Sequence, residues 1–262
     1  MEEFSEQTRE AARIIVAAKH VVALVGAGMS VESGIPPFRG PGGLWTKYGE
    51  PDMGGYDRLV ADPKGWWESI RRREGYASEM LRGIEQAKPN PGHYALAELE
   101  QMGILRCIIT QNVDNLHNAA GSKNVAEIHG NIFKLRCISC GSRYARGEIS
   151  VEVLPPRCPK CGGVIKTDGV LFGEPIPADV LRRCEEETAK CDCMLIIGTS
   201  AQVYPTAGFP SYVHKRGGSL IEINPYDTPL TNSCKVVIRA PSGETLPQIV
   251  AFIKHLRSHN RG

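Results

Sequence analysis

Two pairs of cysteines have the spacing of metal ligands. Cys137 is followed three positions later by Cys140, and Cys158 by Cys161, with 17 residues between the pairs. Glycine directly follows each pair and supplies the turn that a loop around a metal requires. Two thiolates at this spacing bind one tetrahedral ion from one side, and two such pairs complete a site without an open position. The spacing therefore predicts a closed, structural zinc site rather than free thiols or two disulfides.

The chain holds nine cysteines, and an odd number argues against a closed disulfide framework. The five cysteines outside the two pairs are Cys107, Cys184, Cys191, Cys193 and Cys234. Cys107 and Cys234 lie in or beside apolar runs that are typical of strands. The Cys191-Asp192-Cys193 sequence could indicate redox chemistry, but small buried thiols explain it more simply.

A glycine-containing segment, residues 26–40, follows the apolar run Val21–Val25. The run is typical of a buried strand in a parallel sheet. Gly26 and Gly28 allow a tight turn and are expected to bring bare backbone N–H groups close to a ligand. Ser30 offers a hydroxyl where a helix could begin, so the turn suits an anion such as pyrophosphate. The third glycine of a GxGxxG fingerprint is missing, because position 31 is Val.

Small and amide-bearing residues follow three further strand-like runs. Gln111, Asn112 and Asp114 come after 105–110, Gly198-Thr199-Ser200 comes after 194–197, and Asn224 comes after 219–223. In an open parallel sheet, ligands bind outside the carboxyl ends of the strands. These residues can hydrogen-bond sugar hydroxyls and phosphate, so the four strand ends together predict a nucleotide crevice.

The order of elements predicts an α/β fold with a doubly wound parallel sheet. A helical pattern over 5–19 precedes the first strand, Pro91 opens a helix that runs to Met102, further strands are expected at 125–128 and 235–238, and a last helix is expected over about 244–257. We assign 1–40, 91–131 and 169–262 to a Rossmann-like domain and 41–90 to an inserted helical module. The cysteine-containing range 132–168 is a zinc-binding module too small to fold without its metal.

Composition excludes several classes of protein. The net charge of +2 and the pI near 8.1 do not mark a nucleic-acid binder. No apolar run approaches the roughly 18 residues needed to cross a bilayer, and the acidic N-terminus lacks the apolar core of a signal peptide. We expect a cytoplasmic protein without direct nucleic-acid or membrane binding, and a monomer or weak oligomer.

These motifs together resemble the sirtuin family of NAD-dependent protein lysine deacylases. The resemblance rests on residues 26–40, Thr110–His117, His129-Gly130, the two cysteine pairs, Phe172-Gly173-Glu174 and Gly198–Ser200, in order and in spacing. It implies transfer of the acyl group of an N-acyl-lysine to NAD, with release of nicotinamide, free lysine and 2′-O-acyl-ADP-ribose. In the family the acyl oxygen attacks the nicotinamide ribose to form an alkylimidate, and a base then activates a ribose hydroxyl.

The resemblance also implies roles for single residues. His129 is the expected base, because an imidazole titrates near working pH. Asn112 and Asp114, also counted as catalytic, are expected to hold the nicotinamide carboxamide, and Gln111 to reach its ribose. His117 is expected to be structural. The expected NAD-binding residues are Gly26, Ala27, Gly28, Ser30, Ile35, Phe38, Arg39, Gln111, Asn112, Asp114, Gly198, Thr199, Ser200 and Asn224.

Within that set, Ile35 and Phe38 are expected to wall the nicotinamide pocket, and Arg39 to contact phosphate or ribose. Zinc, held by Cys137, Cys140, Cys158 and Cys161, is expected to stabilise its module and not to activate water.

The substrate peptide is expected to pair with Val170, Leu171, Phe172 and Gly173 as an added strand. Many relatives enter this segment with a basic residue, a proline and, two positions later, a valine. Here Lys166 keeps the basic residue, whereas Thr167 replaces the proline and Gly169 the valine.

Acyl preference is judged from the helical module. Relatives that favour succinyl or malonyl groups carry a Tyr-x-x-Arg pair that grips the acyl carboxylate. Our placement puts Ser69 on the tyrosine and Arg72 on the arginine, so half of the pair is missing. We expect an uncharged acyl pocket that favours acetyl and accepts longer fatty acyl groups.

Three other classes of function remain as alternatives. An ADP-ribosyltransferase or NAD hydrolase would use the same crevice with a different acceptor. A non-catalytic nucleotide sensor or chromatin-associated structural protein would not need His129, Asn112 and Asp114. A hydride-transfer dehydrogenase would need the full GxGxxG and an acidic ribose ligand at the usual distance, and both are absent.

Overall fold

Six parallel strands form the main sheet of the computed structural model, which describes residues 4–51, 53–73 and 75–259. The strand order is β3-β2-β1-β7-β8-β9, and every neighbouring pair is parallel. The strands are β1 (Val21–Val25), β2 (Leu105–Thr110), β3 (Val125–Glu127), β7 (Cys193–Ile197), β8 (Ser219–Ile223) and β9 (Val236–Ile238). The chain runs outward from β1 in both directions, which is the strand order of a dinucleotide-binding sheet. The predicted doubly wound sheet is confirmed.

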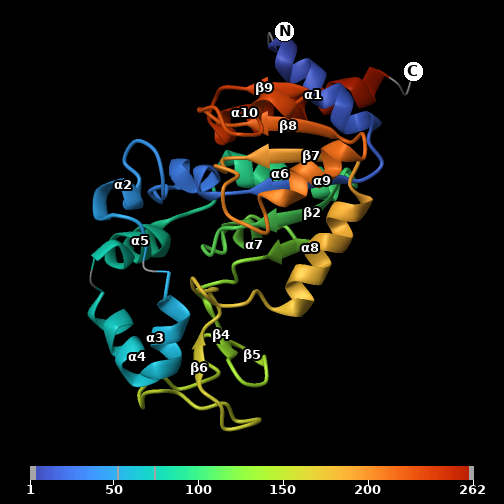
Figure 1. The fold of residues 1–262 in the computed structure, drawn as a ribbon. Coiled ribbons are helices and arrows are strands. Elements are labelled where there is room, and N and C mark those ends of the chain that lie inside the picture. Colours follow the sequence, from blue (N-terminus) through green and yellow to red (C-terminus); the bar gives the residue numbers. More distant parts are fainter. Residues whose placement is uncertain (1–3, 52, 74, 260–262) are drawn as a thin grey trace.

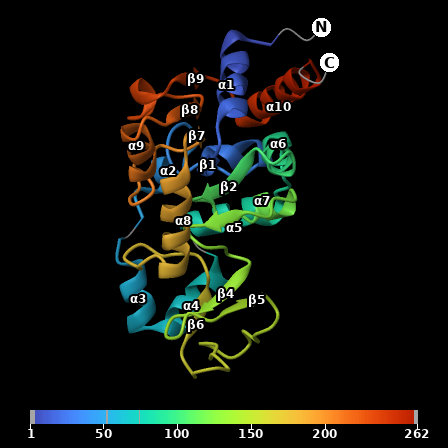
Figure 2. The ribbon, with the colours of Figure 1, turned by 90° about the vertical axis from the view of Figure 1, so that its right-hand side faces the viewer.

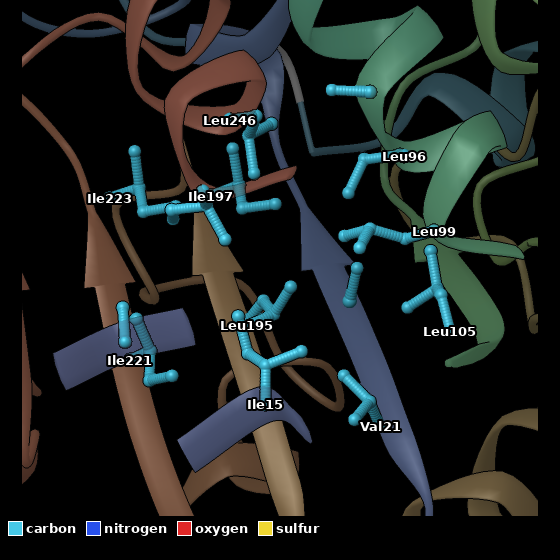
Figure 3. Close-up of a cluster of buried hydrophobic side chains, with 14 of the residues drawn as sticks. Ile15, Val21, Leu96, Leu99, Leu105, Leu195, Ile197, Ile221, Ile223 and Leu246 are labelled. Atoms are coloured by element: carbon cyan, nitrogen blue, oxygen red, sulfur yellow. The ribbon is translucent and has the colours of Figure 1, made fainter. Parts of the chain in front are cut away.

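Helices cover both faces of this sheet, which explains why its strands are mostly apolar. The helices α1 (Glu6–Ala17), α6 (Pro91–Gln101) and α10 (Ser242–His259) pack on one face, where Ile15, Leu96 and Leu246 meet strand residues such as Leu195 (Figure 3). The helices α8 (Ala178–Lys190) and α9 (Gly208–Lys215) cover the other face (Figure 2). Apolar contact on both faces fixes the position of each strand end.

Capping residues define where the helices α1 and α6 begin. Ser5 accepts a hydrogen bond from the backbone N–H of Thr8 and caps α1. Asn90 caps α6 by accepting from the backbone N–H groups of Gly92 and His93, and Pro91 occupies the first turn. The Asn90 amide also donates to the carbonyl oxygen of Met29 at 2.8 Å, which fastens the glycine-containing segment to α6.

A second, smaller group of elements lies beyond one end of the main sheet, far from both termini (Figure 1). Its antiparallel sheet has the order β5-β4-β6, formed by β4 (Lys134–Cys137), β5 (Arg143–Ala145) and β6 (Ile165–Thr167). Four helices accompany it: α2 (Leu44–Tyr48), α3 (Gly55–Ala61), α4 (Pro63–Arg72) and α5 (Gly75–Gln86). These elements fall within the ranges 41–90 and 132–168, and the exact division into domains stays a prediction.

The predicted elements differ from the structure mainly at their ends. The first helix ends at Ala17 and the last begins at Ser242, each about two residues from the prediction. The glycine-containing segment forms a 3₁₀ helix, η1 (Ala27–Ser33), that begins before Ser30. Two short elements complete the fold, α7 (Leu116–Ala119) and the 3₁₀ helix η2 (Thr231–Ser233). Within the described ranges, every helix is too short or too polar to cross a membrane.

Candidate functional site: a cleft at the strand ends

One cleft of about 1740 Å³ opens at the carboxyl ends of the strands and reaches α4, α5 and the small sheet. Most residues predicted for the site line it: Gly26, Ala27, Gly28, Phe38, Arg39, Gln111, Asn112, His129, Val170, Leu171, Phe172, Gly173, Gly198, Thr199, Ser200 and Asn224. Of the predicted residues, Ser30, Ile35 and Asp114 lie outside this lining and are buried. The fold thus brings the ends of β1, β2, β7 and β8 together with residues 170–173.

Gly26 and Gly28 are glycines because β7 comes very close to them. A Cβ atom at Gly26 would lie 2.7 Å from the Cβ of Thr199, and one at Gly28 would lie 2.7 Å from the Cα of Gly198. The N–H of Gly26 donates to Ile197 O at 2.9 Å, and the N–H of Gly28 donates to Gly198 O at 2.8 Å. The N–H groups of these two glycines are therefore used within the protein, and the expectation that the turn brings bare N–H groups close to a ligand stays a prediction. Both residues line the cleft but use their N–H groups to join β1 to β7.

Asn112, Ser30 and Asp114 form a hydrogen-bonded chain in the floor of the cleft. The Asn112 amide donates to Gly26 O at 3.1 Å and to Ser30 Oγ at 3.2 Å. Ser30 Oγ donates to Asp114 Oδ2 at 2.7 Å, and the backbone N–H of Leu116 donates to Asp114 Oδ1 at 2.9 Å. Burial raises the pKa of Asp114, and these two donors act against that rise. Asp114 thus holds Ser30, which in turn holds the Asn112 amide.

His129 faces the cleft from the turn after β3. Its Nδ1 lies 3.2 Å from the carbonyl oxygen of Gln111. Because a carbonyl oxygen only accepts, Nδ1 is the protonated nitrogen and Nε2 keeps its lone pair. Burial lowers the pKa of His129, and the Gln111 carbonyl acts in the opposite direction. The side-chain amide of Gln111 donates to Thr199 Oγ1 at 2.9 Å. The residue whose carbonyl group bonds His129 is thus itself bonded to the turn after β7.

Three aromatic rings in successive contact line the cleft. The ring of Trp45 on α2 lies 5.0 Å from that of Phe38 and 5.9 Å from that of Phe172, centroid to centroid. The Arg39 guanidinium lies 4.2 Å above the Trp45 ring, in cation–π geometry. Trp45 therefore joins residues predicted to bind NAD to the segment predicted to bind peptide. Sequence reasoning assigned no role to Trp45, and its place five residues after Gly40 was the only available signal.

Ile35 is placed differently from the expectation. It packs in a buried cluster with Ile84 of α5 and Leu116 of α7, and it lines a smaller hollow beside α5. In this structure it supports the cleft wall and Phe38 faces the cleft. Its predicted contact with NAD remains a prediction.

Residues 169–173, here called the peptide segment, are anchored through the backbone of successive residues. Gly169 O accepts from Lys166 Nζ at 2.5 Å, Val170 N–H donates to His129 O at 2.8 Å, and Leu171 N–H donates to Glu174 Oε2 at 2.9 Å. Phe172 O accepts from the backbone N–H of Tyr56 on α3 at 3.0 Å. The segment is thus bonded to the small sheet, the His129 turn and the helical module.

A buried group of four charged residues, here called the ion cluster, lies beneath this segment. Arg136 Nε pairs with Asp168 Oδ1 at 2.5 Å, and Arg136 Nη2 pairs with Glu174 Oε1 at 2.7 Å. Lys166 Nζ lies 3.0 Å from Glu174 Oε2, and the Lys166 side chain has no exposed surface. Burial lowers the pKa of Lys166 to about 8, although Glu174 opposes the shift. Sequence reasoning missed Arg136 and Asp168, since single charges beside strand ends carry no distinctive pattern.

The two cysteine pairs converge as predicted. The sulfur atoms of Cys137, Cys140, Cys158 and Cys161 all lie within 4.8 Å of one another. Cys137 Sγ is 3.5 Å from Cys161 Sγ, and Cys140 Sγ is 3.7 Å from Cys158 Sγ. A tetrahedral zinc with Zn–S bonds of about 2.3 Å separates its sulfurs by about 3.8 Å, so the four thiolates fit zinc. The donor set leaves no position for water, in agreement with a structural ion.

The other cysteines behave as core residues. Cys107, Cys184, Cys191 and Cys193 are buried, and Cys234 is half-buried. Burial raises the pKa of Cys107, Cys184 and Cys191 to about 12, so these thiols stay protonated. The interpretation of Cys191-Asp192-Cys193 as buried thiols is confirmed.

Ser69 and Arg72, the two residues used to judge acyl preference, do not both line the cleft. Ser69 lines the cleft, and its hydroxyl donates to Trp66 O at 2.7 Å. Arg72 lies outside the lining, whereas its neighbours Arg71 and Arg73 belong to it. Arg73 makes a two-bond ion pair with Glu85, at 2.9 and 2.6 Å, and Arg71 donates to Val151 O. Both cleft-lining arginines of this helix end therefore have protein partners.

His117 lies away from the cleft, in the interior. It is buried against His93 of α6, with ring centroids 4.9 Å apart. Burial lowers the pKa of His117 well below its ordinary value and that of His93 to about 4. Both rings are held neutral by their surroundings, which agrees with the structural role expected for His117.

The family model described as the Sir2 family matches residues 26–205, which span the glycine-containing segment, His129, the cysteine pairs and the peptide segment. The chain belongs to the Sir2 family. It is 42% identical to the NAD-dependent protein deacylase of Pyrococcus abyssi over 252 residues, which cover 94% of this chain and 98% of that protein. It is 44% identical to the NAD-dependent protein deacetylase of Sulfurisphaera tokodaii, covering 94% and 96% of the two chains.

Solved structures of the Sir2 family have the same fold over almost the whole chain. A complex of a Sir2 homologue with NAD matches with a TM-score of 0.81 at 38% identity, covering 98% of this chain and 97% of the other. A complex of Sir2 with a p53 peptide and NAD matches with a TM-score of 0.72 at 31% identity, covering 96% and 97%. The family resemblance inferred from the motifs is confirmed.

Proposed function

We propose that this chain is an NAD-dependent protein lysine deacylase, and first of all a deacetylase. It transfers the acyl group of an acyl-lysine to the ADP-ribose part of NAD, with release of nicotinamide and 2′-O-acyl-ADP-ribose. One observation carries the proposal. A single cleft collects the strand-end residues, the candidate base His129 and the peptide segment, so both substrates meet beside one imidazole.

The residues that line the cleft suit the parts of NAD. Amide side chains at Gln111, Asn112 and Asn224 offer acceptors to ribose hydroxyls and the carboxamide, while both N–H groups of Asn112 already donate to Gly26 O and Ser30. The Arg39 guanidinium offers charge to phosphate, while Phe38 offers an apolar wall. When bound, NAD supplies the electrophilic ribose carbon and a good leaving group.

The protein contributes orientation and a proton acceptor. Asn112 is held by Gly26 O and by Ser30, which is itself bonded to Asp114, so its amide is fixed before a ligand arrives. His129 presents the lone pair of Nε2, because its Nδ1 is committed to Gln111 O. A neutral imidazole in this state takes a proton from a hydroxyl that is brought to it. The depressed pKa keeps it neutral at physiological pH.

Acyl-lysine peptides are the proposed second substrate, bound as an added strand along Val170–Gly173. The p53 peptide complex of a structural neighbour supports this class of partner. The acyl pocket is proposed to favour acetyl, since Ser69 replaces a tyrosine and Arg71 and Arg73 already bond to the protein. We further propose a cytoplasmic monomer or weak oligomer.

The test is product analysis with NAD and peptides that carry acetyl-, succinyl- or myristoyl-lysine. We expect NAD-dependent loss of acetyl and equimolar 2′-O-acetyl-ADP-ribose, detected by mass spectrometry. Free ADP-ribose or ADP-ribosylated protein without deacylation would show an NAD hydrolase or transferase instead. A clear preference for succinyl would contradict the inference drawn from Ser69. His129→Ala should abolish turnover and leave NAD binding intact, which separates an enzyme from a nucleotide sensor.

A further inference from the structure

The chain enters the peptide segment through Thr167 and Gly169. Neither residue is a proline, and glycine leaves the backbone unusually free, so the unbound segment has considerable conformational freedom of its own. A segment that binds a peptide must be held in one conformation in advance, or peptide affinity is lost to ordering. Contacts from elsewhere in the chain have to restrict residues 167–171.

Lys166 makes the contacts that such a restraint needs. Its ammonium group bonds to Thr167 O at 2.9 Å, to Gly169 O at 2.5 Å and to Glu174 Oε2 at 3.0 Å. An ammonium group has three N–H donors, so all of them are used within this segment. Two of the acceptors are the carbonyl groups of Thr167 and Gly169, the two residues through which the chain enters the segment.

Glu174 holds the other end of the same segment. Its Oε2 accepts from Lys166 Nζ and from the backbone N–H of Leu171, while Oε1 accepts from Arg136. Gly169 and Leu171 are thus tied to one ion pair, and Val170 between them is bonded to His129 O. The Lys166–Glu174 ion pair therefore bonds to the backbone on both sides of Val170.

We propose that Lys166, acting through Glu174, is a positioning residue for the acyl-lysine peptide. It holds the backbone of the peptide segment in one conformation through the carbonyl groups of Thr167 and Gly169. This inference rests on the proposed function and deepens it. Lys166 touches neither the reacting atoms nor the NAD-binding residues, and its effect is confined to peptide binding.

Positions 167 and 169 can accept residues with a stiffer backbone, which allows a compensation experiment. Asp168 N–H donates to Lys134 O, and hydrogen-bonded pairs alternate along an antiparallel ladder, so the N–H of Thr167 is directed away from β4. Proline at 167 therefore breaks no ladder bond. A Cβ atom at Gly169 would meet only Ile132 Cγ2, at an ordinary 3.7 Å, and its φ lies outside the left-handed region.

The experiment measures KM for an acetyl-lysine peptide, KM for NAD and kcat in four variants. Lys166→Met should raise the peptide KM about tenfold, the expected loss of a charged hydrogen-bonded contact, with kcat and the NAD KM within about twofold. Adding Thr167→Pro and Gly169→Val to Lys166→Met should restore most of the peptide KM. Lys134→Met is the matched control, because Lys134 lies on β4 of the same small sheet and its side chain pairs with Glu127 at 2.6 Å, while only its backbone bonds to Asp168.

Each outcome decides the inference. A wild-type chain that fails to deacetylate any peptide refutes the proposed function and with it this inference. An active wild type whose peptide KM is unchanged by Lys166→Met, or changed equally by Lys134→Met, overturns the inference alone. Lys166→Met leaves Glu174 bonded to Arg136 and Leu171, which favours folding. If that variant still fails to fold, Thr167→Pro/Gly169→Val in the wild type decides: a lower or equal peptide KM supports the restraint, and a higher one contradicts it.

Discussion

The backbone N–H of Val170 donates to the carbonyl oxygen of His129 at 2.8 Å. One hydrogen bond therefore joins the candidate base to the segment proposed to bind the acyl-lysine peptide. Gly130 makes this contact feasible, because its φ is +76° and a Cβ there would lie 2.0 Å from Asp168 O. The position of the base and the position of the peptide segment are set by the same turn.

Substituting Gly130 by Ala should disrupt the hydrogen bond between Val170 N–H and His129 O. The methyl group cannot occupy the space of Asp168 O, so residues 168–170 must move away from His129. We expect kcat/KM for the peptide to fall at least about tenfold and stability to drop by about 1–3 kcal/mol, the usual range for forced backbone conformations. Steady-state kinetics and urea unfolding measure the two effects.

Gly103→Ala is the control for backbone strain. Gly103 has a φ of +73°, and a Cβ there would meet nothing within 4 Å. It should cost about 1 kcal/mol of stability, as for alanine in place of a helix-terminating glycine, and leave kinetics unchanged. Equal catalytic losses in both variants would show that strain alone is responsible and would remove the role given to the Gly130–Asp168 contact.

The pH dependence of turnover should report the depressed pKa of His129. The base works as neutral imidazole, and burial lowers its pKa from the ordinary value of 6.5. The neutral form therefore persists to lower pH, and kcat/KM should fall with acid later than it would for an imidazole of ordinary pKa. The quantity that tests this is the midpoint of the profile, which should lie below pH 6.5, measured as kcat/KM for an acetyl-lysine peptide from pH 5 to 8 with NAD affinity determined in parallel. A midpoint above 6.5 would contradict the burial of this imidazole.

Sequence patterns were sufficient for the parts of this site that follow local rules. The cysteine spacing predicted the four-sulfur site, and the residues after β1, β2, β7 and β8 predicted the cleft, because parallel strands end at one edge. The family resemblance added His129, whose type alone does not distinguish a base from a core histidine.

Other features depend on contacts between distant residues and leave no local pattern. The N–H groups of Gly26 and Gly28 bond to β7, which is more than 160 positions away, so their use could not be read from the glycine spacing. Trp45 sits in a helical module whose packing against Phe38 and Phe172 is visible only in three dimensions. The ion cluster likewise assembles from β4, β6 and the two residues that flank the peptide segment, Asp168 and Glu174.

Acid should destabilise the protein through His93. Its folded-state pKa of about 4 lies below the ordinary 6.5, so the unfolded chain binds the additional proton between these values. Stability contributed by neutral His93 is therefore full above pH 6.5 and is lost as pH falls toward 4, by about 3 kcal/mol for a shift of this size. The free energy of unfolding from urea titrations at pH 7, 5.5 and 4.5 tests this. His93→Gln should flatten the curve, while His255→Gln, on α10, should not.

Removal of zinc should disorder the small sheet and weaken peptide binding before it affects the main sheet. The small sheet has few buried apolar residues of its own, whereas the main sheet is covered on both faces. Because Arg136 on β4 holds Asp168 and Glu174, loss of β4 also releases the peptide segment. Incubation with a strong chelator should release about one zinc per chain. It should also raise hydrogen exchange over 134–167 and abolish deacylation, while 193–223 stays protected.

Cys158→Ala should reproduce these effects, and Cys184→Ala, at an equally buried thiol outside the cluster, should retain zinc and activity. Full deacylase activity in zinc-free protein would contradict the link through Arg136.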